Sequence, residues 1–359
     1  MTTHPPDHAG APEAAGVNRE AAIERELSVA EEEIEELRRI SEEGKVDLEA
    51  QIASLEARAE ELREAITRDP TPWQTVQLAR HPERPKVGDF IAGLATEFVE
   101  LHGDRNFRDD PAIIAGLGLI DGRPAAVIGH AKGHDTRENI ARNFGMPNPE
   151  GYRKATRVMR LAEKLRIPIV TLIDTPGAFP GKDAEERGQS EAIARALVEM
   201  ARLRTPIVTV ITGEGGSGGA LAIGIGDVLL MLEHAIYSVI SPEGCAAILW
   251  RDGARTRDAA EALRITARDL TGFGIVDEIV PEPPGGAHRH RDAAVDAVAG
   301  AVRRHLTVLT AQPLETLLAA RYEKFRRVGR LRDVGAPEQA ADGARPAGGA
   351  GRDAGGQAG

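Results

Sequence analysis

Short apolar runs alternate with longer amphipathic segments through the central part of the chain. The apolar runs predict strands at residues 113–120, 125–130, 167–174, 207–212, 228–232, 236–240 and 275–280. Apolar residues that recur every three or four positions predict helices at residues 151–166, 184–203, 217–225, 243–250, 258–271, 291–310 and 313–328. Strands that alternate with helices are typical of an α/β fold. Pro70 and Pro72 end the preceding helical pattern, so we expect one α/β domain over residues 71–330.

The segment before this domain follows a coiled-coil spacing. Its apolar or small residues lie alternately four and three positions apart: Ile23, Leu27, Ala30, Ile34, Leu37 and Ser41, then Leu48, Ile52, Leu55, Ala59, Leu62 and Ile66. This spacing predicts a helical coiled-coil arm over residues 19–70. The pattern slips around Gly44, which fits either a helical hairpin or a stutter. An arm used for packing or assembly is preferred over a solvated pair of surface helices.

Composition separates the ends of the chain from its core. Residues 1–18 and 331–359 are rich in Ala, Gly and either Pro or charged residues, without apolar periodicity, and are predicted to be disordered. The chain of 359 residues has a formal net charge of −11, and residues 1–70, with 19 acidic and 8 basic side chains, account for all of it. An acidic excess in the arm argues against nucleic-acid binding.

Cysteine and histidine usage narrows the chemistry. Cys245 is the only cysteine, which excludes an internal disulfide and a four-cysteine zinc site and favours the cytoplasm. His130, His134 and His234 show no metal-ligand spacing. Apolar runs such as 167–173 are far shorter than the roughly 18 residues that span a bilayer, and no signal peptide opens the chain. We therefore expect a cytoplasmic protein with no membrane segment and no metal.

The glycine-rich segment 213–220 follows a predicted strand and opens a predicted helix. Backbone N–H groups converge at such a junction, where the helix dipole favours negative charge. A second turn with glycine and proline, at residues 174–181, follows the preceding predicted strand. Two turns at the ends of consecutive strands form a crevice lined with main-chain donors. Such a crevice suits an enolate-like oxygen and requires no side-chain nucleophile.

A nucleotide site is the first alternative for the glycine-rich segment. Gly213, Gly215 and Gly218 satisfy the G-x-G-x-x-G pattern of dinucleotide sites, and Glu233 follows the next strand, although the motif lies late in the chain. A phosphate-binding P-loop is excluded because the required Lys and Ser or Thr are absent after Gly218.

A serine hydrolase is the second alternative. Ser217 lies in a G-x-S-x-G pattern, and Asp277 and His288 follow it in the order that such hydrolases use. His288 lies in a glycine-containing loop that need not approach Ser217. The remaining interpretation is a turn that only packs a strand against a helix.

Several longer segments carry a resemblance to a known family. They are residues 73–74, 77–82, 102–105, 142–147, 149–155, 174–181, 185–195, 213–220, 238–246, 281–283 and 285–289. In their order and length, these segments resemble the carboxyltransferase alpha subunit of bacterial acetyl-CoA carboxylase over about residues 73–328.

This resemblance implies a crotonase-like (ClpP/crotonase) fold of repeated ββα units. It implies that carboxybiotin on a biotin carboxyl carrier protein gives its carboxyl group to acetyl-CoA, forming malonyl-CoA for fatty acid biosynthesis. Biotin is then carried by a separate protein, and this chain holds no metal. The implied partners are a carboxyltransferase beta subunit with a zinc ribbon, in an alpha-two, beta-two heterotetramer, and a biotin carboxylase. The chain alone is expected to be inactive.

The resemblance also assigns residues to the site. It implies that the N–H groups of Gly219 and Ala220 form an oxyanion hole on the biotin side of the active site, with no catalytic His or Glu. The residues expected to line the carboxybiotin pocket are Gly177, Ala178, Phe179, Gly181, Gly215, Gly216 and Gly218. Phe179 stands where the family often has Tyr, and Lys182 and Asp183 replace a small uncharged pair, so the shape of the pocket departs from the usual one.

A basic stretch and one acidic residue define the remaining expectations. Arg153, Lys154 and Arg157 lie on a predicted helix and are expected either to contact coenzyme A phosphates or the partner subunit, or to form a solvated face. A stand-alone crotonase-fold acyl-CoA hydrolase or hydratase is the alternative enzyme. It needs a carboxylate facing the oxyanion donors, and Glu214 is the one candidate beside the turn. An assembly scaffold is the non-enzyme alternative.

Overall fold

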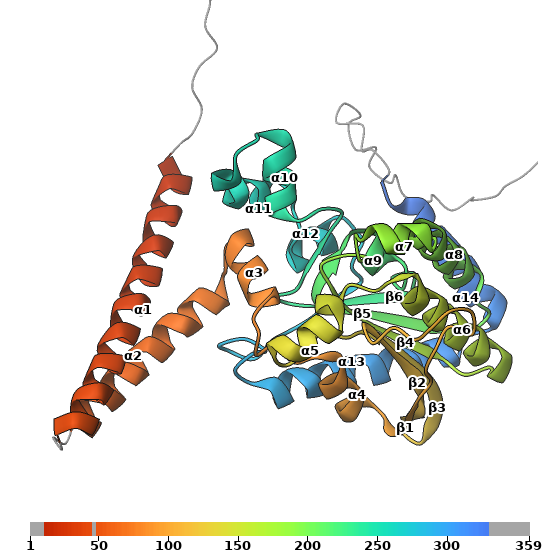
Figure 1. The fold of residues 1–359 in the computed structure, drawn as a ribbon, viewed down its shortest axis with the longest axis horizontal. Helices are drawn as coiled ribbons and strands as arrows, with labels where there is room; N and C mark the ends of the chain where they lie inside the picture. Colours follow the sequence, from red (N-terminus) through yellow and green to blue (C-terminus); the bar gives the residue numbers. More distant parts are fainter. Residues whose placement is uncertain (1–10, 45–47, 330–359) are drawn as a thin grey trace, which may run out of the picture. The chain divides into compact units, whose positions relative to one another are not determined.

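The computed structural model describes residues 11–44 and 48–329 of the chain (Figure 1). Its N-terminal arm consists of helices α1 (Ala11–Gly44) and α2 (Glu49–Arg68). The apolar cluster between these helices comprises Leu27, Ala30, Ile34, Ile52, Leu55 and Ala59. Ion pairs of Arg58 with Glu26 (2.6 Å) and of Arg63 with Glu31 (2.5 Å) also join them. The arm is therefore a helical hairpin, one of the two arrangements that the sequence allowed.

The start of α1 overlaps the segment predicted to be disordered. Helix α1 begins at Ala11, within residues 1–18, and the disorder of this segment stays a prediction. Residues 1–10 and 330–359 lie outside the described residues, and the other predictions of disorder fall on them. The use of the arm in assembly stays a prediction.

The end of α2 is joined to the α/β domain. The Gly285 N–H donates a hydrogen bond to Thr67 Oγ1 (3.2 Å), and Arg289 pairs with Glu60 at 2.5 Å. Pro72 then occupies the first turn of helix α3 (Pro72–Ala79), where a missing N–H costs nothing. Helix α2 thus ends before the proline pair and α3 begins at Pro72, and the domain boundary near residue 71 stays a prediction.

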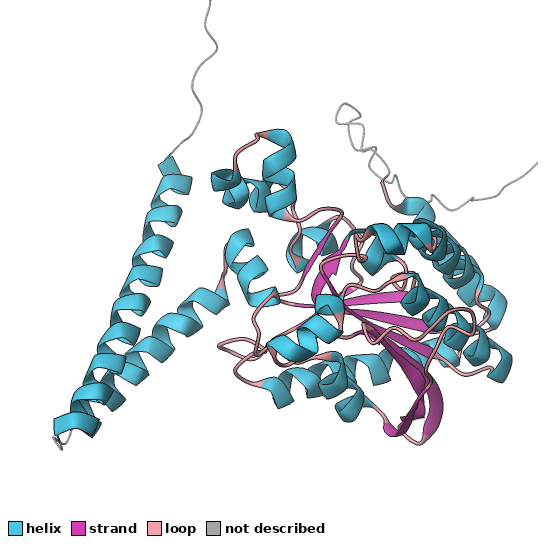
Figure 2. Ribbon diagram, in the orientation of Figure 1, coloured by secondary structure: helices cyan, strands magenta, loops and turns pink. Residues whose placement is uncertain are grey.

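The α/β domain is built on one eight-stranded sheet, drawn in magenta in Figure 2. Its strands are β1 (Thr96–Glu100), β2 (Ile113–Ile120), β3 (Arg123–His130), β4 (Ile169–Thr175), β5 (Ile207–Gly216), β6 (Val228–Leu232), β7 (Ile236–Ser238) and β8 (Glu278–Val280). The spatial order is β1-β2-β3-β4-β5-β6-β8, and β7 pairs with the end of β5. The first three strands are antiparallel, and the strands from β3 to β8 are parallel.

Helices cover both faces of this sheet (Figure 1). Besides α3, they are α4 (Val87–Leu94), α5 (Thr136–Ala141), α6 (Pro149–Leu165), α7 (Lys182–Glu186), α8 (Gln189–Arg202), α9 (Ser217–Leu221), α10 (Pro242–Leu249), α11 (Thr256–Ala262), α12 (Ala267–Gly272), α13 (Arg291–Thr310) and α14 (Leu314–Arg327). Helix α6 packs against β2, β3 and α8, whereas α13 packs against α4, β5 and β8. The succession β6-β7-α10, and β2-β3 followed by α5 and α6, agree with the ββα units that the family resemblance implies.

Two glycine positions explain where the observed elements differ from the predicted ones. The predicted helix 184–203 is divided into α7 and α8 because Gly188 between them has φ +83°, a left-handed conformation that favours glycine. Strand β5 runs to Gly216 rather than ending at residue 212, since Gly215 pairs with both Thr175 and Tyr237. The glycine-rich segment is thus half strand and half helix.

Candidate active site

The two predicted turns meet at the carboxyl ends of β4 and β5, which are parallel neighbours. A Cβ atom added to Gly216 would lie 2.0 Å from the carbonyl oxygen of Pro176, and one added to Gly219 would lie 2.5 Å from the Ala178 nitrogen. Real Cβ atoms do not approach backbone so closely, so only glycine fits at these positions. The structure therefore brings the turns into direct backbone contact, as the sequence predicted.

Helix α9 supplies unpaired backbone donors at this contact. The first four N–H groups of a helix have no partner within it. Because the N-cap of α9 is Gly216, the Gly219 N–H belongs to this set, and Ala220 follows it as the next residue of the helix. Both residues are buried. The Ala178 nitrogen of the opposite turn lies against Gly219.

The turn after β4 is held by hydrogen bonds from three directions. Thr175 Oγ1 donates to the Gly177 carbonyl (2.7 Å) and accepts from the Gly177 N–H (3.1 Å). The Phe179 N–H donates to the Pro147 carbonyl (3.0 Å), and Gln189 Nε2 donates to the carbonyls of Phe179 and Pro147, at 2.9 Å each. This bonding fixes the backbone on which Gly177, Ala178 and Phe179 lie.

The other predicted pocket glycines have different surroundings. A Cβ atom on Gly181 would meet the Phe179 ring at 2.4 Å, and one on Gly215 would meet the Tyr237 ring at 2.6 Å. These two glycines make room for aromatic rings. A Cβ atom on Gly218 would touch only the side chain of Ile193, at 3.7 Å, so this position has space.

A buried charge cluster lies directly behind the turns, and sequence reasoning missed it. Lys132 Nζ contacts Asp174 Oδ1 at 2.7 Å and Glu214 Oε2 at 2.8 Å. Arg80 Nε contacts Glu214 Oε1 at 2.6 Å, and the Glu214 N–H donates to Asp174 Oδ1 at 3.0 Å. The cluster joins the first residue of one turn to the second residue of the other.

Electrostatics favour the charged forms of Asp174 and Lys132. Burial acts to raise the pKa of Asp174, but the ammonium group of Lys132 outweighs it and holds that pKa below its usual value. Burial likewise acts to lower the pKa of Lys132, and Asp174 and Glu214 raise it above its usual value. Glu214 therefore serves as a partner for two cations and is not free to act as a general base.

The competing motifs are not assembled into sites. Gly213 and Gly215 lie within strand β5, not in a strand-to-helix turn as a dinucleotide motif requires. Ser217 is exposed with φ +50°, but Asp277 accepts hydrogen bonds from the Leu229 N–H and from Lys324. His288, the histidine that a hydrolase would need beside Ser217, packs instead against His81, with 4.1 Å between the ring centroids.

Helix α6 places the three predicted basic residues differently from expectation. Lys154 is fully buried, and its ammonium group contacts Asp109 Oδ1 (2.7 Å) and the Asp110 carbonyl (2.8 Å). The predicted contact of Lys154 with phosphate or with a partner is therefore wrong. Arg153 and Arg157 are partly exposed, so their predicted contacts stay predictions.

The cysteine and one of the histidines considered in the sequence lie in buried surroundings. Cys245 is buried, and His234 Nδ1 lies 3.2 Å from Glu282 Oε2 in a buried cluster with Arg84. Within residues 11–44 and 48–329, no group of three or more His, Cys, Asp or Glu side chains is arranged to hold a metal ion. Over the same residues, no helix is both long and apolar enough to cross a membrane.

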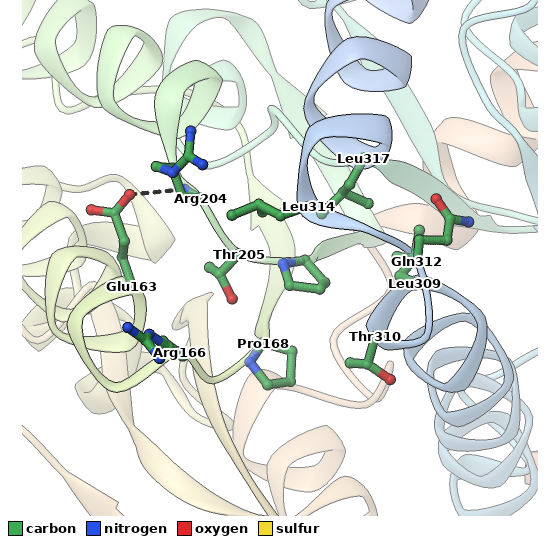
Figure 3. A pocket seen from close by; sticks show the side chains of 11 residues that line it. Glu163, Arg166, Pro168, Arg204, Thr205, Leu309, Thr310, Gln312, Leu314 and Leu317 are labelled. Atoms are coloured by element: carbon green, nitrogen blue, oxygen red, sulfur yellow. Dashed lines mark hydrogen bonds between the residues drawn. The ribbon is translucent and has the colours of Figure 1, made fainter.

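Two cavities were compared with this position. One of about 450 Å³ adjoins α9 and is lined mainly by apolar groups, including Leu221, Phe273 and Phe325. Another of about 690 Å³, shown in Figure 3, is lined by Pro168 and Thr205, which precede β4 and β5. Ligands of parallel α/β sheets bind at the carboxyl ends of the strands, so the second cavity lies at the wrong end for catalysis.

Comparison with solved structures gives the class of the fold. The transcarboxylase 12S structure with methylmalonyl-coenzyme A and methylmalonic acid bound matches with a TM-score of 0.51 and 19% identity, over 62% of this chain and 42% of that chain, less than half its length. A Pseudomonas malonate decarboxylase hetero-tetramer in complex with coenzyme A matches with a TM-score of 0.52 and 17% identity, over 67% of this chain and 93% of that one. The fold is that of the crotonase-like carboxyltransferases.

Sequence comparison gives the family. The model of the acetyl co-enzyme A carboxylase carboxyltransferase-like family matches residues 20–329. The acetyl-coenzyme A carboxylase carboxyl transferase subunit alpha of Methylococcus capsulatus is 56% identical over 299 residues, covering 83% of this chain and 93% of its own. That of Geobacter metallireducens is 55% identical over 301 residues, covering 84% and 94%. The chain belongs to this family of carboxyltransferase alpha subunits.

Proposed function

We propose that this subunit forms the half of a carboxyltransferase site that receives carboxybiotin from a biotin carboxyl carrier protein. The acceptor is acetyl-CoA, and the product is malonyl-CoA. The observation that carries the proposal is the backbone contact between the turns at 174–181 and 213–220, which sets main-chain donors at the carboxyl end of the sheet. Biotin, when bound, supplies an activated carboxyl group.

In this proposal, the N–H groups of Gly219 and Ala220 donate to the oxygen on which negative charge develops as the carboxyl group is transferred. Such donors are most effective when their position is fixed before the reaction. The hydrogen bonds of Thr175 and Gln189 fix the turn at 174–181. The Lys132 cluster fixes the first residues of both turns. Gly177, Ala178 and Phe179 then form the wall opposite α9.

The donors fit a ligand whose reacting atom is a carbonyl-type oxygen. A glycine backbone has no side chain to block an approaching ring, and Gly218 has open space where a Cβ would stand. The stand-alone hydrolase or hydratase is not favoured, because Glu214 is paired with Lys132 and Arg80. A protein that used Glu214 as a base would need to break both ion pairs first.

Activity is expected to require a second chain. We infer that a carboxyltransferase beta subunit with a zinc ribbon binds acetyl-CoA, and that the two subunits form an alpha-two, beta-two heterotetramer supplied by a biotin carboxylase. The purified chain alone is expected to form no malonyl-CoA from carboxylated carrier protein and acetyl-CoA. Adding the beta subunit is expected to give malonyl-CoA, measured by chromatography of the coenzyme A esters. Hydrolysis of acyl-CoA thioesters by the chain alone would contradict this assignment.

The helical hairpin at the N-terminus is proposed as an assembly element. Deleting residues 1–66 leaves Thr67, which accepts the hydrogen bond from Gly285, and is expected to leave the thermal unfolding of the α/β domain nearly unchanged. The same deletion is expected to reduce the number of subunits in the complex formed with the beta subunit. Light scattering measures this number from the mass of the complex, after allowing for the deleted residues. A complex of unchanged stoichiometry would show that the arm has no part in assembly.

A further inference from the structure

A groove rich in arginine lies between α6 and α8 and is bordered by the loop before β2. Its cavity has a volume of about 590 Å³. Its basic lining residues are Arg105, Arg153, Arg157, Arg160, Arg187 and Arg195. The acidic side chains that line it are Asp104 and Glu191. Six arginines against two acidic side chains give this lining an excess of cations, whereas residues 71–359 as a whole have no formal net charge.

Most of these arginines are neutralised by carboxylates. Arg153 lies 2.8 Å from Asp104 and 3.0 Å from Glu150, and Arg187 also contacts Glu150, at 2.8 Å. Arg195 lies 2.6 Å from Glu191. Arg160 is paired in the same way with Glu199 on α8. Their positive charge is therefore largely balanced within the protein.

Arg105 and Arg157 differ from the others. Arg105 Nη1 donates to the His102 carbonyl (3.0 Å), and Arg157 donates to the carbonyls of His102 (3.2 Å) and Gly103 (3.1 Å). In the part of the chain that the structure describes, neither guanidinium has a carboxylate within 4.0 Å. Both guanidinium groups donate to the His102 carbonyl, so two like charges lie near each other, and a bound anion would relieve their repulsion.

The pKa of Arg157 reflects this surplus charge. Burial and the neighbouring Arg105 both lower it from the usual value for an arginine. Nearby Asp109 and Asp104 act in the opposite direction but do not offset these effects. A bound anion would restore the balance.

The loop that presents Arg105 is fixed in advance. Asp104 Oδ1 accepts hydrogen bonds from the N–H groups of Asn106 (3.0 Å), Phe107 (2.8 Å) and Arg108 (3.1 Å). The Gly103 N–H donates to Asp109 Oδ1 at 2.8 Å, and the buried Lys154 holds that same carboxylate. Lys154 therefore helps to fix the loop that presents Arg105, through its contact with Asp109.

We propose that this groove binds a phosphorylated small molecule, with Arg105 and Arg157 donating to its phosphate oxygens. Guanidinium groups have a planar fork of donors that matches phosphate oxygens, which favours phosphate over a simple anion. The remaining arginines border the same cavity, but their carboxylate partners balance most of their charge, so the phosphate contacts rest on Arg105 and Arg157. A confined cavity favours a small ligand over a nucleic acid, which needs an extended basic track.

Isothermal titration of the full chain with sodium pyrophosphate, ADP and coenzyme A tests this proposal. We expect saturable binding of at least one probe, weakened as the NaCl concentration rises because the contact is between charges. Tighter binding of coenzyme A than of ADP or pyrophosphate would identify coenzyme A as the source of the phosphates. Equal binding of ADP and pyrophosphate would identify a free phosphorylated metabolite. These titrations use neither biotin nor a beta subunit, so their outcome is independent of the proposed carboxyl transfer.

Two substitutions complete the test. Arg105→Asn is expected to weaken binding of the preferred probe about tenfold or more, since one charge-assisted contact is lost. Asparagine tolerates the left-handed backbone of this position, φ +62°, so folding is preserved. Arg326→Ala removes an exposed arginine of α14 and is expected to bind like the wild type. Absence of saturable binding to all three probes, equal affinities of the two variants, or binding of RNA alone would overturn the proposal.

Discussion

Replacing Gly219 with alanine is expected to lower the rate of carboxyl transfer by roughly 100-fold or more, the usual cost of losing an oxyanion donor. The added methyl group would lie 2.5 Å from both the Ala178 nitrogen and the Gly177 carbonyl carbon. Neither atom belongs to a flexible side chain, so the two turns must separate and the donors must move. The rate is measured as malonyl-CoA formation by the complex with the beta subunit.

Gly218→Ala is the matched control for this prediction. Its methyl group would touch only Ile193, at 3.7 Å, and alanine in place of glycine favours a helix by about 0.5–1 kcal/mol. We therefore expect unchanged or slightly higher thermal stability and a much smaller loss of rate. Full activity of Gly219→Ala, in a complex that assembles normally, would show that the donors lie elsewhere.

Replacing Lys132 with methionine is expected to cost about 3–5 kcal/mol of unfolding free energy, because it removes the ion-pair partner of the buried Asp174 and leaves Glu214 with Arg80 alone. Asp174 and Glu214 are 6% and 8% exposed and share this ammonium group. Urea denaturation of the purified chain measures the loss. Lys164→Met, at an exposed position on α6, is the control and is expected to change the free energy of unfolding by less than about 0.5 kcal/mol.

The pH dependence of this variant gives a second readout. In the wild type, the pKa of Asp174 is lowered from 3.8 and that of Lys132 is raised from 10.5, so both contributions are fully present between pH 5 and pH 9. Without Lys132, burial raises the carboxyl pKa instead, and protonation then stabilises the folded state. The deficit of Lys132→Met is therefore expected to shrink as the pH falls from 7.5 to 5. A deficit that is independent of pH would contradict the ion-pair explanation.

The predicted and observed folds agree where burial dictates the sequence. Strands β4 and β5 have no exposed position, and continuous apolar runs predicted them. The edge strand β1 was missed because its sequence, Thr-Glu-Phe-Val-Glu, is half exposed and carries two acidic residues. Helix α4 was missed because its eight residues make little more than two turns, too few for its apolar positions to show a helical periodicity.

The candidate site was predictable only as far as local sequence determines it. Glycine runs after consecutive strands predicted the two turns, and adjacent parallel strands bring such turns together. The cluster of Arg80, Lys132 and Glu214 was not predictable, because these residues come from three separate segments and no spacing relates them. Lys154 was misassigned for a related reason. The sequence pattern of α6 shows which of its residues share a face, but it does not show that the loop at 101–110 covers Lys154.

The backbone contact between Gly216 and Pro176 and between Gly219 and Ala178 has a consequence for inhibitor chemistry. Reactive electrophiles need a nucleophilic side chain, and here Cys245 is buried and Ser217 makes no hydrogen bond to a histidine of residues 11–44 and 48–329. Amide donors cannot be alkylated or acylated in this way, so covalent inhibitors would find no anchor at the turns. Reversible compounds that present a carbonyl-type oxygen to α9 are the better match. Resistance to such compounds would require a change in the backbone of the two turns, which their close contact makes energetically costly.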